Sequence, residues 1–580
     1  MNARTITPTV LAAHFVLAFS ALCVAQTPVP YSLNAKPKTV IEASELARRA
    51  RNGLGIRVDN TVIRGRLDLS YRVIERQFSI TNCDFQEEPD LSYSTFKRHV
   101  VLEGSTFRKG AKFESMTVDY NAHFDRARFL AGEANFRYLQ VHGTLTARAA
   151  QFANGVNVIA AGAHFDKDVD LSNADFGGPA IFYGAEAHSD LSFDAATFRQ
   201  QIVLTTAKIG GSLFLRDSHF FGPALFAGIQ VTYNVRAERA VFKDYVNLTD
   251  SQISSFLDLS RARFESTDKP VHFVRANVAR GGYFDGVEFA GRVKFDGAHF
   301  NADASFDQAV FNHVVSFDRA RFDQTVHFEH CSFKDNVSFH QTSFGSLLLS
   351  QNGQVQGKDQ FGGTVDLRGC TYDRVQVRWQ SLFRMYDGSP RLTTLDQQPY
   401  SQLLKSYQAA GDNDTANEVL LEWHRLKRQE IFRSSKFRWL ADCLSWLTSN
   451  YGVAPGRLLE ISALLLLLGM LIFSRPGAVL RSATNGQPNV ERTDNAMPIR
   501  LPHWEAVAVS LHQFLPIEVP FGSEWIPTSD LVTLRLTHRY RGVIILRMRP
   551  STYATVLKIS GYILVPLEIV VLNGLLNPVM

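Results

Sequence analysis

The chain has 580 residues, of which 45% are hydrophobic and 20% are charged, and its net charge at pH 7 is +5. This composition is ordinary for a folded protein with room for two or more domains. The small positive excess, without any lysine- or arginine-rich run, argues against nucleic-acid binding. The unusual feature is the presence of 43 phenylalanines beside only 7 methionines. Their spacing along the chain predicts the fold.

Residues 1–25 are predicted to be a secretory signal peptide. Arg4 supplies a positive charge ahead of the short apolar run Val10–Val24, and small residues at the end of this run fit a cleavage site. The run is shorter than a typical membrane span, so we expect its removal and the export of the remaining chain. A lipid anchor through Cys23 is disfavoured, because the bulky Leu22 precedes it.

Residues 40–56 are predicted to cap the N-terminal end of the next segment. The stretch VIEASELARRARN at 40–52 has a helical pattern, and Gly53 and Gly55 follow it. An uncovered sheet end would invite pairing with other chains. We therefore expect this helix to cover the first coil of the repeat.

Residues 57–380 repeat a large apolar side chain at alternating intervals of five and six residues, a period that neither a helix nor a simple strand has. A smaller residue, usually Ala or Val, stands two positions earlier. Cys83, Cys331 and Cys370 fit this small position, and the cysteines show no metal-type spacing. The frame slips around 130–164 and is most regular further on. The twelve core positions that follow it without a gap are Phe284, Phe289, Phe295, Phe300, Phe306, Phe311, Phe317, Phe322, Phe328, Phe333, Phe339 and Phe344.

This module resembles that of the pentapeptide repeat family, which has a small residue, a variable one, a large apolar one and two variable ones. The resemblance implies a right-handed, four-sided parallel β-helix with the small and large residues inside. Because alternate modules here have a sixth residue, we expect about 22 residues per coil and altered corners. About fourteen coils spaced by about 4.8 Å would form a rod about 65 Å long, with each phenylalanine ring lying over another.

Residues 395–450 are predicted to be helical. Tyr400–Ala409 and Asp414–Glu430 carry apolar residues at helical intervals on either side of a polar break, which indicates a helical hairpin that serves as a cap or spacer. Phe437–Leu447 is apolar and contains two tryptophans. We expect this last segment to lie in a membrane interface.

Two later segments, 458–474 and 556–577, are predicted membrane spans, the second with a weaker apolar pattern. The connection between them, 475–555, carries most of the basic residues close to the spans, so the positive-inside rule predicts that it is cytoplasmic. The six basic residues of 425–438 oppose this orientation from a greater distance. The chain is therefore expected in the bacterial inner membrane, with the repeat domain on the outer, periplasmic side.

The membrane segment suggests a further function. Two spans could form a potassium-type pore, but His512–Gly522 contains no T-V-G-Y-G filter, and Trp504–Leu515 is interpreted as a short amphipathic or re-entrant helix. Glu568 lies near the middle of the second span, where a carboxylate is costly and is a candidate for function. Alternatively, Glu568 is protonated or bonds backbone freed by Pro566, or the segment lies on the membrane without crossing it.

Acidic residues in the repeat form a second feature. They sort by coil into two columns of like charge, which need partners, and basic residues lie near them in sequence. The acidic residues are Asp285, Asp296, Asp307, Asp318 and Glu329, and the basic ones are Arg319, Arg321 and Lys334. Some proteins that the repeat resembles imitate DNA through an acidic face, but such a role requires a negative rod in the cytoplasm.

No catalytic, cofactor-binding or metal-binding residue is predicted. His327 and His330 straddle an inward phenylalanine and are expected to face solvent. The sequence contains no nucleotide-binding loop, nucleophile elbow or zinc-protease motif. We therefore expect a membrane-anchored, exported scaffold, not an enzyme, that binds an unidentified protein or envelope component. The alternatives are a transport or signalling element that acts through the membrane hairpin, and a divergent envelope enzyme.

Overall fold

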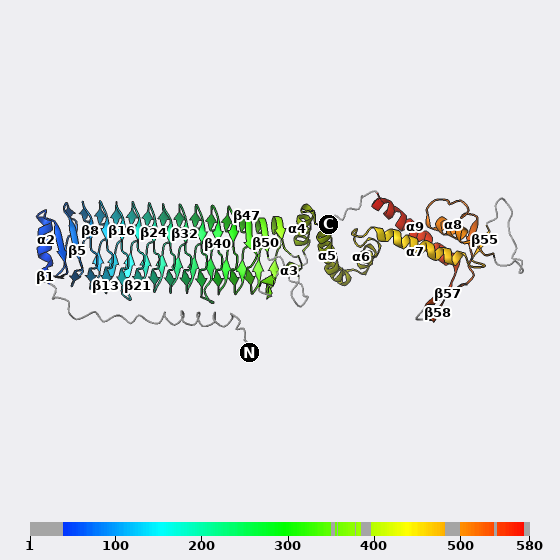
Figure 1. Ribbon diagram of the computed structural model, residues 1–580, viewed down its shortest axis with the longest axis horizontal. Coiled ribbons are helices and arrows are strands. Elements are labelled where there is room, and N and C mark those ends of the chain that lie inside the picture. Colours follow the sequence, from blue (N-terminus) through cyan, green and yellow to red (C-terminus); the bar gives the residue numbers. More distant parts are fainter. Residues whose placement is uncertain are drawn as a thin grey trace, which may run out of the picture. The chain divides into compact units, whose positions relative to one another are not determined.

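The computed structural model describes residues 39–349, 354–355, 358–377, 379–383, 396–481, 499–538 and 542–572 (Figure 1). The predicted signal peptide lies outside these residues. The chain divides into two compact units, Met1–Ser254 and Ser255–Met580.

Three parallel sheets of 14, 12 and 26 strands form a β-solenoid of about fourteen turns with about 22 residues per turn. One turn contains four short strands, β14 (Glu133–Asn135), β15 (Gln140–Val141), β16 (Leu145–Thr146) and β17 (Gln151–Phe152). Each strand pairs in parallel with the equivalent strand of the next turn, as β14 does with β18 (Asn157–Ile159). The predicted parallel β-helix with a 22-residue turn is thereby confirmed.

The corners show how modules of two lengths fit into one turn. In the five-residue modules, the second residue after the inward side chain has a positive φ, as at Ser115 (52°) after Phe113 and Arg126 (57°) after Phe124. Residues other than glycine rarely adopt this conformation, and it persists only where the surrounding structure enforces it. The six-residue modules alternate with the five-residue ones, so that four modules together make one turn of about 22 residues.

Phenylalanine rings fill the interior of the first unit. One column of rings shows centroid separations of 4.5–5.1 Å and interplanar angles of 1–14°. Each offset-stacked pair contributes about 0.5–1.5 kcal/mol beyond its buried area. The column contains Phe85, Phe107, Phe129, Phe152, Phe176, Phe198, Phe220 and Phe242.

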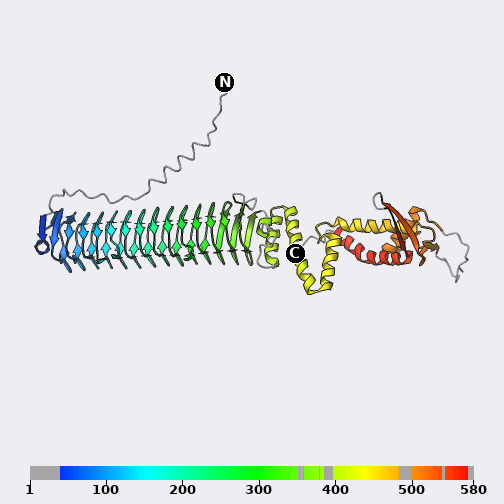
Figure 2. The ribbon, with the colours of Figure 1, turned by 90° about the horizontal axis from the view of Figure 1, so that it is seen from below.

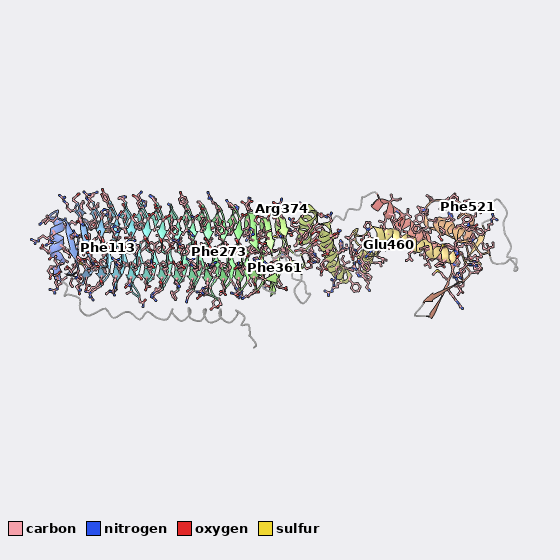
Figure 3. The ribbon with its side chains drawn as sticks, viewed as in Figure 1. Phe113, Phe273, Phe361, Arg374, Glu460 and Phe521 are labelled. Atoms are coloured by element: carbon pink, nitrogen blue, oxygen red, sulfur yellow. The ribbon has the colours of Figure 1, made fainter. Side chains whose placement is uncertain are left out.

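The twelve predicted core phenylalanines, Phe284 to Phe344, belong to the second unit and are all buried, with at most 4% of each exposed. They occupy all four columns, and rings one turn apart in the same column stack on one another. In one column, Phe284 stacks on Phe306 at 4.5 Å and Phe306 stacks on Phe328 at 4.8 Å. Figure 3 labels Phe273 and Phe361, which continue neighbouring columns of this unit, and Phe113 in the first unit.

The frame slip at 130–164 has a structural counterpart inside the first unit. Ala147 and Ala160 occupy positions where most turns carry a larger residue, and both are buried. A small apolar gap of about 30 Å³ lies beside them, lined by Phe124, Phe136 and Phe165 among others. The smaller side chains at these two positions therefore leave a small apolar gap in the core.

The N-terminal end is covered by one strand and one helix. The helix predicted over 40–52 is α2 (Ala43–Arg51), and it buries Leu46. Residues 40–42 were predicted wrongly as helix, because they belong to β1 (Thr39–Glu42), which pairs in parallel with β3 (Thr61–Arg64). The first strand thus extends the sheet by one strand, and the helix that follows covers the end of the solenoid.

The C-terminal end of the solenoid is covered by α4 (Gln397–Ala409). The side-chain amides of Gln398 and Gln402 donate to the backbone carbonyls of Cys370 and Tyr372, each at 2.8 Å. These bonds satisfy one acceptor of the last strand, β54 (Thr371–Gln376), and one of the residue before it, which the end of the solenoid would otherwise present to another chain. The first part of the predicted hairpin therefore acts as a cap.

The remaining elements of the second unit are mainly helical (Figure 2). They are α3 (Trp379–Phe383), α5 (Asn413–Ser434), α6 (Lys436–Ser449), α7 (Gly456–Phe473), α8 (His503–Phe514) and α9 (Pro550–Leu572). Two small antiparallel pairs lie between α7 and α9 in sequence: β55 (Val479–Arg481) with β56 (Trp525–Pro527), and β57 (Val532–His538) with β58 (Gly542–Met548). The spans predicted at 458–474 and 556–577 correspond to α7 and α9, and residues 573–577 lie outside the described residues.

Candidate functional site

The outer surface of the first unit carries ion pairs that link successive turns. In each pair an arginine of one turn contacts an aspartate of the turn before it. The pairs, with their N–O distances, are Arg108–Asp84 (2.7 Å), Arg148–Asp125 (2.6 Å), Arg199–Asp175 (2.9 Å) and Arg239–Asp217 (2.6 Å). Because these charges neutralise one another, the surface presents little net field to a charged partner.

The pair of Asp125 and Arg148 gives the solenoid a pH-dependent contribution to stability. Burial acts to raise the pKa of Asp125, but hydrogen bonds from the guanidinium and the backbone N–H of Arg148 hold this pKa below its ordinary value. A carboxylate with a lowered pKa stabilises the fold above its unfolded pKa of about 3.9 and loses that contribution as the pH falls further.

We therefore expect the free energy of unfolding to fall as the pH drops below about 4, and we expect the D125N variant to lose less of it over that interval. Chemical denaturation of both proteins at a series of pH values measures the difference. Parallel pH curves for the parent and D125N would contradict this role of Asp125.

The two acidic columns of the second unit find partners that the sequence did not indicate. The hydroxyl groups of Ser305, Ser316 and Ser338 donate to Asp285, Asp296 and Asp318, respectively, one turn away. Two of the three suggested basic residues bind elsewhere: Arg321 pairs with Asp323 at 2.5 Å, and Lys334 donates to Asn312 at 2.5 Å. Serine hydroxyls therefore accompany three of the five carboxylates, and the other two, Asp307 and Glu329, lie beside histidines.

One corner of the first unit carries exposed tyrosines. Tyr71 and Tyr93 stack with their ring centroids 4.9 Å apart, and the ring of Tyr138 lies over Gly162, where a Cβ would come within 2.8 Å of two ring carbons. Two turns further along, Gly184 occupies the position equivalent to Tyr138, and the neighbouring residue Tyr183 is 55% exposed. We call Tyr71, Tyr93, Tyr138 and Tyr183 the tyrosine edge.

A group of histidines and carboxylates lies on the face next to the tyrosine edge, and sequence reasoning missed it. His164 and Glu186 are partners in the parallel register of β19 (His164–Phe165) and β23 (Glu186–Ala187). His188 lies two residues beyond Glu186 in the same turn. The 22-residue interval from 164 to 186 was a usable signal, but it falls where the frame slip obscured the register.

The two histidines singled out from the sequence lie on the solenoid surface. The side chain of His330 is 68% exposed and its Nδ1 lies 2.6 Å from an Asp307 oxygen. His327 is partly exposed, with its Nδ1 3.5 Å from Glu329. Each histidine thus has a single carboxylate neighbour on the surface, as expected for a solvated side chain.

Helix α6 presents an apolar face to its surroundings. Phe437, Leu440, Leu444 and Leu447 are exposed and recur at intervals of three or four residues. Exposed side chains in this helical pattern form a continuous stripe, which is typical of a helix lying at a membrane interface. The stripe begins 19 residues before α7 starts at Gly456.

Helices α7 and α9 are long and apolar enough to cross a membrane, and both views of the ribbon show them side by side (Figure 2). Helix α8 packs against both. A Cβ added at Gly469 of α7 would lie 2.5 Å from the Ser510 hydroxyl, and one added at Gly561 of α9 would lie 1.6 Å from the Phe514 carbonyl oxygen. The connection from 475 to 555 therefore includes a helix seated against the two candidate spans.

Glu568 has a side-chain partner on the other span. Its carboxylate accepts a hydrogen bond from the Ser462 hydroxyl of α7, and Ser462 is buried. Tyr553 of α9 makes a second link between the helices, because its hydroxyl donates to the Leu465 carbonyl at 2.6 Å. The structure thus gives Glu568 a hydroxyl partner on α7, which no local sequence pattern indicates.

The sequence matches no protein-family model, and no curated protein or solved structure is similar enough to match.

Proposed function

We propose that this protein is an exported scaffold, held at the outer face of the bacterial inner membrane, that binds a protein or envelope component through the tyrosine edge. The observation that carries the proposal is the division of side chains in the first unit. Large apolar residues stack inside, surface charges pair with one another, and tyrosines remain exposed along one corner. Tyrosine supplies a large, rigid contact area with a polar tip, and it is enriched at binding surfaces.

The repeat supports placing the chain with the pentapeptide repeat proteins, whose module it resembles. A small inward residue two positions before a large one, repeated through about fourteen turns, is the arrangement that this module implies. The short corners leave little room for long insertions on which an active site would be built. The proposal therefore assigns binding to the solenoid and no catalytic step.

The membrane segment supports anchoring. At 1.5 Å per residue, the 18 residues of α7 and the 23 residues of α9 span about 27 Å and about 35 Å, which brackets the bilayer core of about 30 Å. The exposed stripe of α6 adds an interfacial contact before the first span. Basic residues in the connection favour a cytoplasmic location for it, and hence a periplasmic solenoid.

Cysteine labelling with a membrane-impermeant maleimide tests this arrangement. Cys83, Cys331 and Cys370 are buried, so a C443S background leaves no native cysteine exposed among the described residues. In that background we expect Y183C to be labelled once the outer membrane is permeabilised. S529C, an exposed position in the connection, should be labelled only after the inner membrane is broken. The reverse pattern would contradict a periplasmic solenoid.

A second candidate function is transport or signalling through the membrane hairpin. The observation that favours it is the hydrogen bond between Glu568 and Ser462 inside a pair of candidate spans, together with α8 seated against both helices. Placing a carboxylate at this depth in a membrane costs free energy, so such a residue is a candidate for function. Proton and cation flux in liposomes should then fall with E568Q and persist with E460Q, whose parent residue is exposed on α7. Equal flux in the two variants and the parent would remove this candidate.

A further inference from the structure

The strongest group of possible metal ligands in the described residues lies on two neighbouring turns of the first unit. One ligand atom each from His164, Glu186 and His188 lies within 4.8 Å of the other two. The imidazole rings of the two histidines meet edge to face, with their centroids 4.6 Å apart. Two imidazoles and a carboxylate form a ligand set that suits zinc and related divalent transition metals.

The distances are close to those of a bound ion. The Nδ1 of His164 lies 3.5 Å from the Oε2 of Glu186. Ligand atoms held at about 2.1 Å around a tetrahedral zinc are about 3.4 Å apart, so this pair already has the required separation. His188 is more exposed, with 59% of its side chain accessible, and it can rotate without disturbing the core.

The surrounding residues orient these ligands as outer-shell groups do in metal sites. The other ring nitrogen of His164, Nε2, lies 3.1 Å from the Oδ1 of Asp166. The second oxygen of Asp166 is held by the Nδ1 of His142 at 2.8 Å. With its Nε2 directed at Asp166, His164 offers Nδ1 to an ion beside Glu186.

The two carboxylate oxygens of Glu186 likewise have different partners. Lys208 donates to its Oε1 at 2.8 Å, which leaves Oε2 directed at His164. His164, Glu186 and Lys208 come from three successive turns that stack in register, since β23 pairs with both β19 and β27 (Lys208–Ile209). The rigid stacking of these turns fixes the backbone positions from which the ligands project.

We propose that His164, Glu186 and His188 bind a divalent transition-metal ion, with Asp166 positioning His164. The three ligands leave at least one coordination position open toward solvent, because His188 lies at the surface. That position takes water, or a donor atom from a bound molecule. The site adds a metal-dependent function to a face of the solenoid for which the sequence nominated no ligand.

Zinc titration of the chelator-treated, detergent-solubilised full-length protein tests the proposal. By isothermal titration calorimetry we expect one saturable site that H188A and E186Q each weaken at least a hundredfold. D166N should weaken it by about tenfold, as outer-shell substitutions do. H330A is the matched control, because it removes an exposed histidine beside a single aspartate elsewhere, and it should leave the affinity unchanged.

Cobalt provides an independent readout. Co²⁺ bound by two histidines and a glutamate should give a visible absorption band that H188A abolishes and H330A retains. A variant whose melting temperature, measured by circular dichroism, equals that of the parent has an intact fold. Zinc affinity and cobalt spectra that are the same in the parent, H188A and E186Q would overturn the assignment, as would the absence of saturable binding in the parent.

Discussion

Replacing Phe198 with alanine is expected to lower the free energy of unfolding by about 3–5 kcal/mol. Phe198 is 1% exposed and stacks between Phe176 at 4.8 Å and Phe220 at 5.0 Å. The substitution removes a ring from the middle of a column, so two stacked contacts are lost and the neighbouring turns cannot collapse far enough to fill the space. Chemical denaturation of the full chain, followed by circular dichroism in the β region, measures the loss.

Phe221 provides the matched control for this substitution. It is the same residue type, one turn further along, but 44% of it is exposed and its ring lies beneath the Lys243 ammonium group at 4.9 Å. We expect F221A to cost less than about 1 kcal/mol. Equal destabilisation by F198A and F221A would mean that the inner column does not stabilise the solenoid.

Replacing Gly561 with valine is expected to displace α8 from α9. The added Cβ would lie 1.6 Å from the backbone carbonyl oxygen of Phe514, and backbone cannot move aside as a flexible side chain can. Overpacking of this kind costs about 1–3 kcal/mol, and more where backbone must shift. In detergent we expect the helical signal to melt at a lower temperature, and the fluorescence of Trp504 and Trp525 to change before that melting.

Gly456 is the control position for the helical segment. It is the first residue of α7, and no atom lies within 4 Å of the position that its Cβ would take. G456V should therefore melt close to the parent protein. If G561V and G456V melted together, the close approach of α8 to α9 would not contribute to the stability of the membrane segment.

The interior of the solenoid could be predicted from the sequence because each large apolar residue occupies a fixed place in its own module. The positions from Phe284 to Phe344 needed no knowledge of neighbouring turns. The buried cysteines followed the same logic, and burial raises the pKa of the Cys331 thiol and of the Cys370 thiol.

The surface was much harder to predict, because its contacts join residues about 22 positions apart. The serine partners of the acidic columns and the cluster around His164 depend on which residues of successive turns share a register. The tyrosine edge depends on corner conformation as well, since Tyr138 stands at a positive φ of 53°. The packing of α8 against Gly469 and Gly561 joins segments separated by long stretches of sequence, and no local pattern encodes it.

Site-specific photocrosslinking in living cells tests most directly whether the tyrosine edge is a binding surface. A photoreactive phenylalanine analogue at Tyr138 should form adducts of discrete mass with an envelope component. The same analogue at Leu130, an exposed residue of the same turn away from the tyrosine edge, should form none. The absence of adducts at Tyr138, or equal adducts at both positions, would contradict the proposed scaffold function.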